Sequence, residues 1–506
     1  MSVLRLAVGG RTGRTLPPPG RARRAGYPRG VPPIRTEGPF RDVVIAGTDD
    51  GGFSSLRQAA IPREERRALG KRLRETVPRS SLGDWEPPAD RVDPVEQVRA
   101  AHEGRLPELV PIRVGRMVAS PYAFLRGAAA THAADFAALP RTGITPVVCG
   151  DAHLGNFGFY ASPERNLVFD LNDFDEAHPG AWEWDLRRLT TSAWVAGRQN
   201  GAKEGHCEDA VLTCLRAYRE QVHRLAELPL VQRSYERLDV EALRGTSGSA
   251  LQDEVDRAAK RARRRTSDRA LPRFTEEHAE RGRRIVEEPP LITHPPQEVA
   301  EGLAEALDVY LGTLPPHWAR MLAGYRLVDV AHKVVGVGSV GLRAYVALCE
   351  GSSPDDVVFL QLKQARRSVL APWVHGQVPR HEHQGQRVVE YQQALQTVSD
   401  PLLGWATAGG HQFYVRQFRD MKGAIEVDGI DHEALVDYAG VCGALLAKGH
   451  ARTSGASTIA GYLGSSDKAD EALARFARAY ADQTEADHAA LVRAVERGAL
   501  PADRDR

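Results

Sequence analysis

The stretch CGDAHLGNFGFYASPERNLVFDLNDFDEAHPGAWEWDL, residues 149–186, decides the fold. The apolar segment TPVVCG that leads into it predicts a buried strand ending in a tight turn at Asp151. Further on, NLVFDL (166–171) predicts a second strand, and a cluster of acids that includes Asp170 and Asp173 surrounds its end. Clustered carboxylates repel one another unless a cation or a hydrogen-bond donor neutralises them. The stretch therefore predicts a cation site held by strands.

The turn itself has the form D-x-H-x-x-N, made by Asp151, His153 and Asn156. Such a turn directs a carboxylate and an amide oxygen toward one point. A second carboxylate from the next strand would complete a site of hard oxygen ligands suited to Mg²⁺. Asp170 and Asp173 both remain open for that role, and we favour Asp173. The alternative is that these acids only cap turns.

This loop is similar to that of the aminoglycoside and choline phosphotransferases, which are kinase-like enzymes. The resemblance implies that Asp151 orients the acceptor hydroxyl, while Asn156 and Asp173 hold the metal ions that bridge the nucleotide phosphates. It also matches Asp185 to a structural aspartate of those enzymes. This chain has Cys149 where they usually have histidine.

A second motif, VVGVGSVG, contains Gly336, Gly338 and Gly341 in a G-x-G-x-x-G pattern. A strand-like segment follows it rather than a helix, so the glycines predict the tip of a hairpin, like the kinase flap that covers nucleotide phosphates. The next strand ends near Lys363, one of only eight lysines in the chain, and we expect it to reach the phosphates. Glu390, in the helix after it, is expected to pair with Lys363. The alternative is a plain β-turn followed by a solvated lysine.

The order of these parts is the reverse of that in kinases, because Gly336 follows Asp151 by 336 − 151 = 185 residues. We predict an α+β fold with a two-lobed, protein-kinase-like architecture in which the lobe order is circularly permuted. The prediction requires the two stretches to meet across one cleft, with Lys363 within about 10 Å of Asp173.

The chain is predicted to have four parts. Residues 1–57 are rich in Arg, Pro and Gly and predict a disordered tail. A mainly helical lobe with the catalytic-type loop follows at 58–325, a small β-rich lobe with the glycine flap at 326–425, and helices that pack back on the larger lobe at 426–506.

Composition excludes several classes of protein. The 67 basic and 66 acidic residues leave a net charge of +1, so no specific nucleic-acid partner is expected. No apolar run approaches the roughly 18 residues of a membrane span, and no membrane partner is expected. Five cysteines without a C-x-x-C pair fit a reducing cytoplasm.

The motifs GVGSVGLRAYVAL, YVRQFRDMKG and LVPIRVGRM, together with the stretch quoted first, resemble an uncharacterised bacterial family, domain of unknown function 2252. The resemblance covers about residues 60–490 and implies no activity. Near SPYAF, Arg113, Arg116 and Arg126 are expected to form ordinary ion pairs, and binding of phosphate or an acidic substrate is the alternative.

The predicted function is ATP- and Mg²⁺-dependent transfer of phosphate to a hydroxyl of a small-molecule acceptor. One alternative is a metal-dependent hydrolase that uses Asp151, His153, Asp170 and Asp173. The other is a non-catalytic, pseudokinase-like module that binds nucleotide. The acceptor and the oligomeric state remain open.

Overall fold

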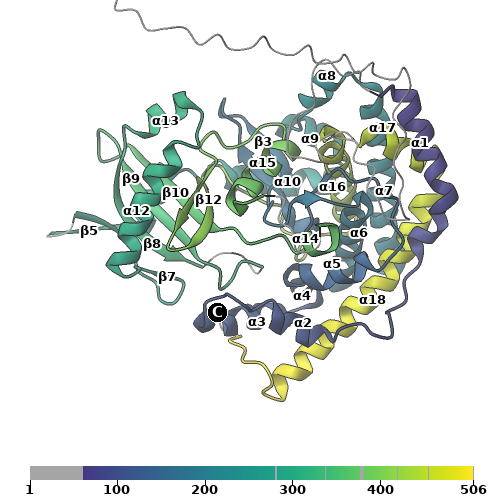
Figure 1. Ribbon diagram of the computed structural model, residues 1–506, viewed down its shortest axis with the longest axis horizontal. Helices are drawn as coiled ribbons and strands as arrows, with labels where there is room; N and C mark the ends of the chain where they lie inside the picture. The colour runs from purple at the N-terminus through teal and green to yellow at the C-terminus, as the bar shows by residue number, and fades with distance from the viewer. Residues whose placement is uncertain are drawn as a thin grey trace, which may run out of the picture. The chain divides into compact units, whose positions relative to one another are not determined.

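The computed structural model describes residues 61–504 except 280–281, 335, 337, 376–380, 419 and 454. The tail predicted at 1–57 lies outside these residues. The described chain has an α+β fold, in which helices carry most of the structure and one antiparallel sheet carries the glycine motif (Figure 1). In the part of the chain described, no helix combines the length and apolar character needed to cross a membrane.

The first half of the chain is helical around two short two-stranded sheets, β1–β4 and β2–β3. Its elements are α1 (Arg63–Thr76), α2 (Pro94–Ala100), α3 (Val110–Val118), α4 (Pro121–Gly127), α5 (Ala129–Ala137), β1 (Val147–Val148), β2 (Phe157–Ala161), β3 (Leu167–Leu171), β4 (His178–Pro179), α6 (Trp182–Gln199), α7 (Glu204–Glu227), α8 (Leu230–Ser234), α9 (Val240–Thr246), α10 (Ser249–Ala262) and α11 (Ser267–Phe274). The hairpin β2–β3 separates the D-x-H-x-x-N turn from the acidic segment. It therefore returns the chain to the turn, and its second strand, β3, is the strand predicted at 166–171.

The second half contains the large sheet and the C-terminal helices. Its elements are β5 (Thr275–His278), β6 (Gly282–Ile285), β7 (Ile292–Thr293), α12 (Gln297–Leu311), α13 (Pro316–Leu322), β8 (Arg326–Lys333), β9 (Ala344–Glu350), β10 (Val357–Gln364), α14 (Ala371–His375), α15 (Gln384–Leu395), β11 (Gly404–Ala408), β12 (His411–Gln417), α16 (His432–Arg452), α17 (Ala456–Leu463) and α18 (Lys468–Glu496). The strand order in the sheet is β11-β12-β10-β9-β8-β7, and every pair is antiparallel.

Strand β10 lies inside the sheet and is buried on both faces. Because side chains alternate between the faces of a strand, Leu360 and Leu362 share one face and Gln361 and Lys363 the other. The two leucines pack with residues of α12 and α13, which cover that face (Figure 1). Lys363 consequently points to the opposite face, where the acidic segment approaches.

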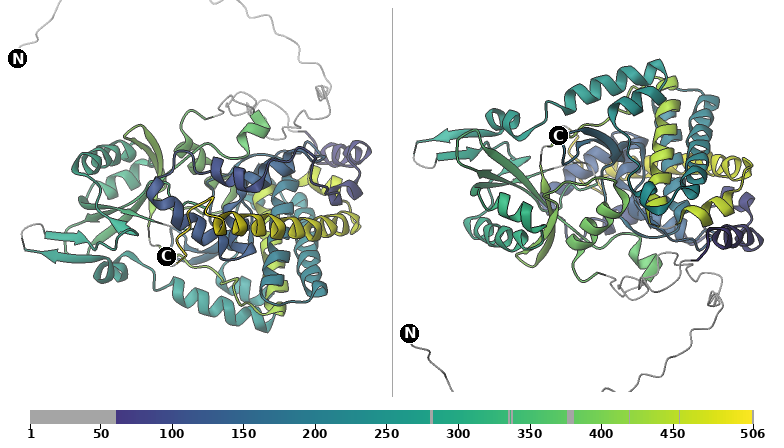
Figure 2. Two further views of the ribbon diagram at one scale, coloured as in Figure 1. Left: turned by 90° about the horizontal axis from the view of Figure 1, so that it is seen from below. Right: turned by 90° about the horizontal axis from the view of Figure 1, so that it is seen from above.

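The helical part forms the largest apolar core. Helix α6 is buried along nearly its whole length, and α7, α16, α17 and α18 contribute to the same core. Helices α1 and α17 pack closely through glycine, since a Cβ on Gly461 would lie 2.2 Å from the backbone oxygen of Arg67. Figure 2 shows the long C-terminal helix α18 beside helices from the start of the chain. This packing fixes the base on which the D-x-H-x-x-N turn rests.

Two elements differ from the sequence prediction. The Ala-rich segment 120–139, whose apolar spacing predicts one continuous helix, divides into α4 and α5 at Ala128, whose backbone leaves the helical region. Helices α12 and α13 fall inside the range 58–325 assigned to the helical lobe, yet they pack on the sheet. Helical periodicity shows that a helix has an apolar face, but it does not show which layer that face covers.

Candidate functional site

A buried aspartate fixes the turn that carries Asp151 through hydrogen bonds to its backbone. Asp185, in the first turn of α6, accepts hydrogen bonds from the backbone N–H groups of Cys149 at 2.7 Å and Gly150 at 2.8 Å. Gly150 has a positive φ of 78°, and a Cβ there would lie 2.4 Å from the backbone oxygen of Glu176. The sequence therefore needs glycine at this position, and Asp185 sets the direction in which the next residue leaves the turn.

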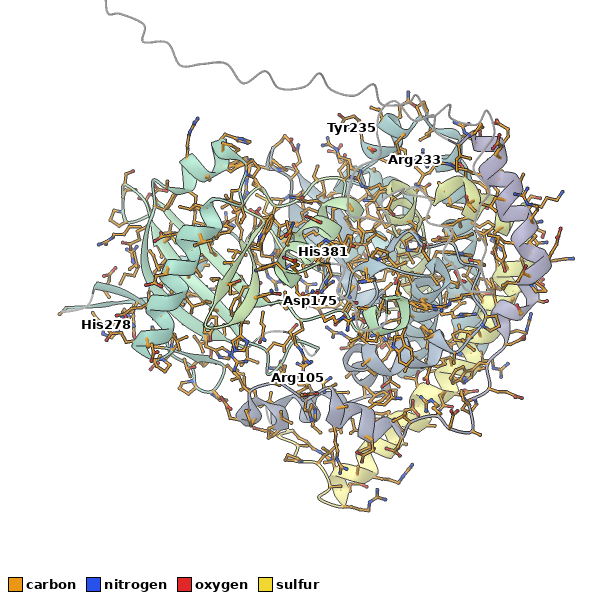
Figure 3. All side chains as sticks on the ribbon, viewed as in Figure 1. Arg105, Asp175, Arg233, Tyr235, His278 and His381 are labelled. Atoms are coloured by element: carbon orange, nitrogen blue, oxygen red, sulfur yellow. The ribbon has the colours of Figure 1, made fainter. Side chains whose placement is uncertain are left out.

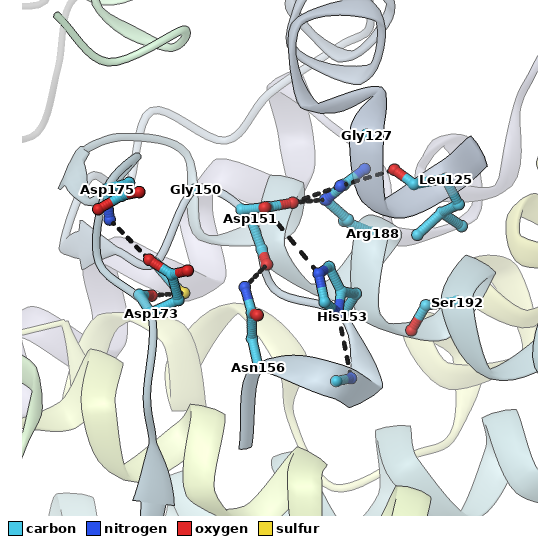
Figure 4. A network of polar contacts seen from close by, with 12 residues as sticks. Leu125, Gly127, Gly150, Asp151, His153, Asn156, Asp173, Asp175, Arg188 and Ser192 are labelled. Carbon is cyan, nitrogen blue, oxygen red and sulfur yellow. Dashed lines mark hydrogen bonds and ion pairs between the residues drawn. The ribbon is translucent and has the colours of Figure 1, made fainter. Parts of the chain in front are cut away.

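Asp151 lies between an arginine and a histidine (Figure 4). Arg188 donates to Asp151 Oδ1 with an Nε–O distance of 2.5 Å, and His153 Nε2 lies 4.0 Å from Asp151 Oδ2. Burial raises the pKa of Asp151 to about 7, although Arg188 opposes this, and nearby Glu176 and Asp173 add to the rise. A carboxylate with a pKa near neutrality is matched to receiving a proton from a hydroxyl.

The other two polar residues of the turn hold its shape. Asn156 donates from Nδ2 to the backbone oxygen of Asp151 at 2.7 Å, which leaves the amide oxygen Oδ1 for another partner. His153 accepts a hydrogen bond from the Gly155 N–H at its Nδ1, at 3.1 Å. Burial, aided by the charge of Arg188, lowers the pKa of His153 well below its usual value, so the ring is neutral at pH 7. His153 thus stabilises the backbone of the turn.

Lys363 meets the acidic segment directly. Its Nζ lies 2.5 Å from Asp175 Oδ2 and 3.6 Å from Asp173 Oδ2. Burial alone lowers the pKa of Lys363, but the two carboxylates outweigh burial and raise the pKa above its usual range. Burial raises the pKa of Asp173, but Lys363 and Arg416 outweigh it, and the pKa lies below its usual value. The Lys363 ammonium and the Asp173 carboxylate are therefore charged at neutral pH.

The acidic segment is also tied to the D-x-H-x-x-N turn. Cys149 Sγ donates to the backbone oxygen of Asp173 at 3.3 Å. This thiol links the two loops that present Asp151 and Asp173.

The glycine motif forms the turn between β8 and β9, as predicted. Gly336 and Gly341 have positive φ angles of 66° and 86°. The backbone oxygen of Gly336 accepts from Arg116, and that of Gly341 accepts from Leu106 N at 2.8 Å. The turn is thus held against the segment that contains α3.

One cavity of about 520 Å³ joins these groups. Its lining includes both halves of the predicted site, namely Asp151, Asn156, Asp173, Asp175, Gly336 and Gly338. Ligand pockets have volumes of about 300–1,000 Å³, so the cavity has room for a nucleotide-sized ligand. Gly341 lies behind it, against the side chain of Arg105.

Two of the predicted site residues lie elsewhere. Asp170 is buried in an ion pair with Lys448, its Oδ1 accepts from Leu171 N, and it does not line the cavity, whereas Asp173 does. Glu390 accepts from His381 at 2.8 Å and from Gln386 at 2.8 Å instead of pairing with Lys363. In its place Asp175 pairs with the lysine.

Sequence reasoning missed Asp175 and Arg188 as site residues. Asp175 was visible as the second acid of Asp173-Phe174-Asp175, but nothing in a linear sequence says which of two acids meets a remote lysine. Arg188 follows Asp185 by three residues, which places both on one side of α6. That spacing could have indicated an arginine near the turn.

A protein family model matches the part of the chain that contains these residues. The model of the family described as "Uncharacterized protein conserved in bacteria (DUF2252)" matches residues 105–494, more than half of the chain. The chain belongs to this family. The resemblance noted from the sequence motifs is thereby confirmed. No curated protein matches the chain, and no solved structure matches it.

In this DUF2252 chain, a second polar cluster lies beside Lys363 and Asp173. Arg416 donates to Gln361 at 3.1 Å, and Lys422 donates from Nζ to the backbone oxygen of Gln417 at 3.0 Å. Burial, aided by the charge of Arg416, lowers the pKa of Lys422 to about 7. The cavity at this cluster measures only about 20 Å³, so the cluster fills its space with side chains.

Proposed function

We propose that this DUF2252 protein is an ATP- and Mg²⁺-dependent phosphotransferase that acts on a hydroxyl of a small-molecule acceptor. The observation that carries the proposal is the contact of Lys363 with Asp173 and Asp175, two acids that line the cavity. The lysine comes from the sheet, and the acids come from a loop far earlier in the chain. Kinase chemistry needs a cation for the phosphates and carboxylates for the metal at one place.

The connectivity of the sheet supports a kinase-like architecture with permuted lobe order. Strands β8, β9 and β10 form a meander, α15 follows, and β11 and β12 add a hairpin next to β10. In protein kinases a glycine-rich loop covers the phosphates and the phosphate-binding lysine lies on the third strand. Here the glycine turn joins the first two strands of the meander and Lys363 lies on the third. A site depends on which groups meet in space, so the reversed chain order is compatible with it.

The residues present fit a magnesium ion. Asp173 offers a carboxylate to the cavity, and Asn156 offers an amide oxygen because its Nδ2 is engaged by the backbone of Asp151. Mg²⁺ is typically bound through one or two such oxygens together with substrate phosphates. When bound, it would neutralise charge on the phosphate oxygens.

The remaining groups have separate tasks in the proposed reaction. Lys363 would contact the nucleotide phosphates, and the glycine turn would cover them. Asp151 would orient the acceptor hydroxyl and receive its proton as the oxygen bonds to the γ-phosphorus and the bond to the bridging oxygen of ADP breaks. The pKa of about 7 suits Asp151 to this proton transfer. Catalysis of this kind depends on positioning and electrostatic stabilisation.

The hydrolase alternative receives less support from the geometry. Of its four proposed residues, Asp170 is paired with Lys448 and does not line the cavity. His153 lines the cavity, but its Nδ1 accepts the N–H of Gly155 and only Nε2 is left as a metal ligand. Among residues 61–504 that the structure describes, no group of three or more His, Cys, Asp or Glu side chains is arranged to hold a metal. A catalytic metal held mainly by protein ligands is therefore not favoured.

Thermal unfolding of the purified protein tests the proposal, with Mg²⁺ alone, ATP alone and both together. A ligand that binds only the folded state raises the unfolding temperature. We expect a rise mainly with the pair, and consumption of ATP when the correct acceptor is supplied from a metabolite library. Asp173→Asn should abolish both effects, whereas the matched control Glu390→Gln should keep them. A rise of the unfolding temperature with Mg²⁺ alone would favour the hydrolase. If ATP stabilises the protein without being consumed, and stabilises Asp151→Asn equally, the non-catalytic module would be favoured.

A further inference from the structure

Four of the arginines that line the cavity concern us here, and we call them the arginine wall: Arg105, Arg113, Arg126 and Arg366. They come from three separate places in the chain, namely the residues before α3, the helices α3 and α4, and the end of β10. Figure 3 labels Arg105 and Asp175, which both line the cavity. The wall therefore faces the same space as the acids of the proposed catalytic site.

None of these four guanidinium groups forms an ion pair with a carboxylate of the residues that the structure describes. Arg105 donates to the backbone oxygens of Ala101 at 2.8 Å and Val340 at 2.5 Å. Arg113 donates to the backbone oxygen of Gly127 at 2.8 Å and contacts His102 Nε2 at 3.0 Å. The nearby acid Glu176 accepts from the N–H of Val369 at 2.7 Å. Arg113 and Arg126 therefore do not form the ordinary ion pairs expected from the sequence with any described residue.

Two donors of the wall are buried without a hydrogen-bond partner in the described chain. They are Nε of Arg113, whose side chain is almost fully buried, and Nε of Arg126. Burial, with the charges of Arg105 and Arg366, lowers the pKa of Arg113 to about 9. Burial and Arg366 lower that of Arg105 to about 10. Arg105 and Arg113 both remain charged at pH 7. The wall therefore holds several guanidinium cations close together, and two of its N–H donors have no partner in the described chain.

The wall extends to the proposed catalytic aspartate. The charge of Arg126 contributes to the lowered pKa of His153, whose Nε2 lies 4.0 Å from Asp151. Guanidinium groups bind phosphate through paired hydrogen bonds, and several of them together match a doubly charged anion better than a singly charged one. A ligand anchored on the wall would hold its uncharged end near Asp151.

We propose that the arginine wall binds a phosphate group of the acceptor, so that the substrate is a small molecule with both a phosphate monoester and a free hydroxyl. This rests on the proposed function. The hydroxyl oxygen would form a bond to the γ-phosphorus of ATP as the bond to the bridging oxygen breaks, ADP would leave, and the hydroxyl proton would pass to Asp151. The phosphate held by the wall is not transferred.

Calorimetric titration of the full chain, without Mg²⁺ or ATP, tests the wall on its own. The probes are inorganic phosphate and glycerol 2-phosphate, with acetate and glycerol as the singly charged and uncharged controls. We expect saturable binding of both phosphate compounds and none of the controls. Arg126→Met and Arg366→Met should each weaken phosphate binding at least tenfold. Arg366 is exposed, so its substitution leaves folding intact, and Arg257→Met on the outer face of α10 is the matched control.

A further variant separates this proposal from the proposed function. Asp173→Asn should lose binding of Mg²⁺ with ATP but keep binding of glycerol 2-phosphate. Absence of phosphate binding in the wild-type protein, or unchanged affinity in both arginine variants, would overturn the proposal. Competition between ATP and glycerol 2-phosphate would overturn it too, because the wall would then belong to the nucleotide. If the protein binds glycerol 2-phosphate but never Mg²⁺ with ATP, the proposed function fails while the anion site stands.

Discussion

Replacing Lys363 with methionine tests the contact between the sheet and the acidic segment. Met keeps most of the apolar stem but removes the ammonium, which leaves Asp173 and Asp175 facing each other. Removing one partner of a buried ion pair costs about 3–5 kcal/mol. The Asp175 side chain is 23% exposed and that of Asp173 39% exposed, so water screens part of the loss. We therefore expect Lys363→Met to lower the free energy of unfolding by about 2 kcal/mol.

A double-mutant cycle isolates the pair from other effects of the substitution. The free energy of unfolding in urea is measured for the wild type, Lys363→Met, Asp175→Asn and the double variant. We expect a coupling energy of about 1.5 kcal/mol, because the Nζ–Oδ2 distance is 2.5 Å. The same cycle with Glu390→Gln should give less than about 0.5 kcal/mol, since Glu390 bonds His381. Equal coupling to both acids, or coupling to Glu390 alone, would refute the reasoning.

Four further predictions concern other parts of the molecule. Asp185→Asn weakens the hydrogen bonds that Asp185 accepts from two buried N–H groups, so it should lower the free energy of unfolding by about 1–3 kcal/mol. It should also abolish the binding of Mg²⁺ with ATP, measured by calorimetry. Asp170→Asn should destabilise the fold because it breaks the buried ion pair with Lys448, yet it should leave the binding of Mg²⁺ with ATP unchanged. Loss of that nucleotide binding would contradict a purely structural role for Asp170. Gly461→Ala should lower the melting temperature because its Cβ meets backbone at 2.2 Å, whereas Gly302→Ala, in open space on α12, should raise it slightly. Lys422 has a pKa lowered to about 7, so the folded state binds fewer protons than the unfolded state between about pH 7 and 10, and the free energy of unfolding rises with pH in this range. This rise should be smaller in Lys422→Met by about 3 kcal/mol, and parallel pH profiles of the two proteins would exclude this.

The sequence predicted the elements of the candidate site better than their partners. The D-x-H-x-x-N turn and the glycine hairpin are local features, because turn chemistry and strand periodicity are encoded within a few residues. The alternation of β10 likewise explains why Lys363 points away from the leucines that pack under α12. These features depend on neighbours in sequence, and short-range patterns describe them well.

Short-range patterns could not predict which residues, far apart in the sequence, form ion pairs with one another. Asp175 rather than Glu390 meets Lys363, and Asp170 turns away to Lys448, because packing of the β2–β3 hairpin and of α16 decides which acid faces which cation. The arginine wall also depends on the packing of α3 and α4 against the glycine turn. Such contacts arise from tertiary packing, which a single sequence does not display.

The most direct test of the central claim is calorimetric binding of ATP in the presence of Mg²⁺ to the wild type, Asp173→Asn and Lys363→Met. These substitutions lie in the two remote parts of the chain that line one cavity. The account predicts one saturable site in the wild type and at least a tenfold weaker affinity in each variant. Unchanged affinity in either variant would contradict the claim that both parts of the chain build a single nucleotide site.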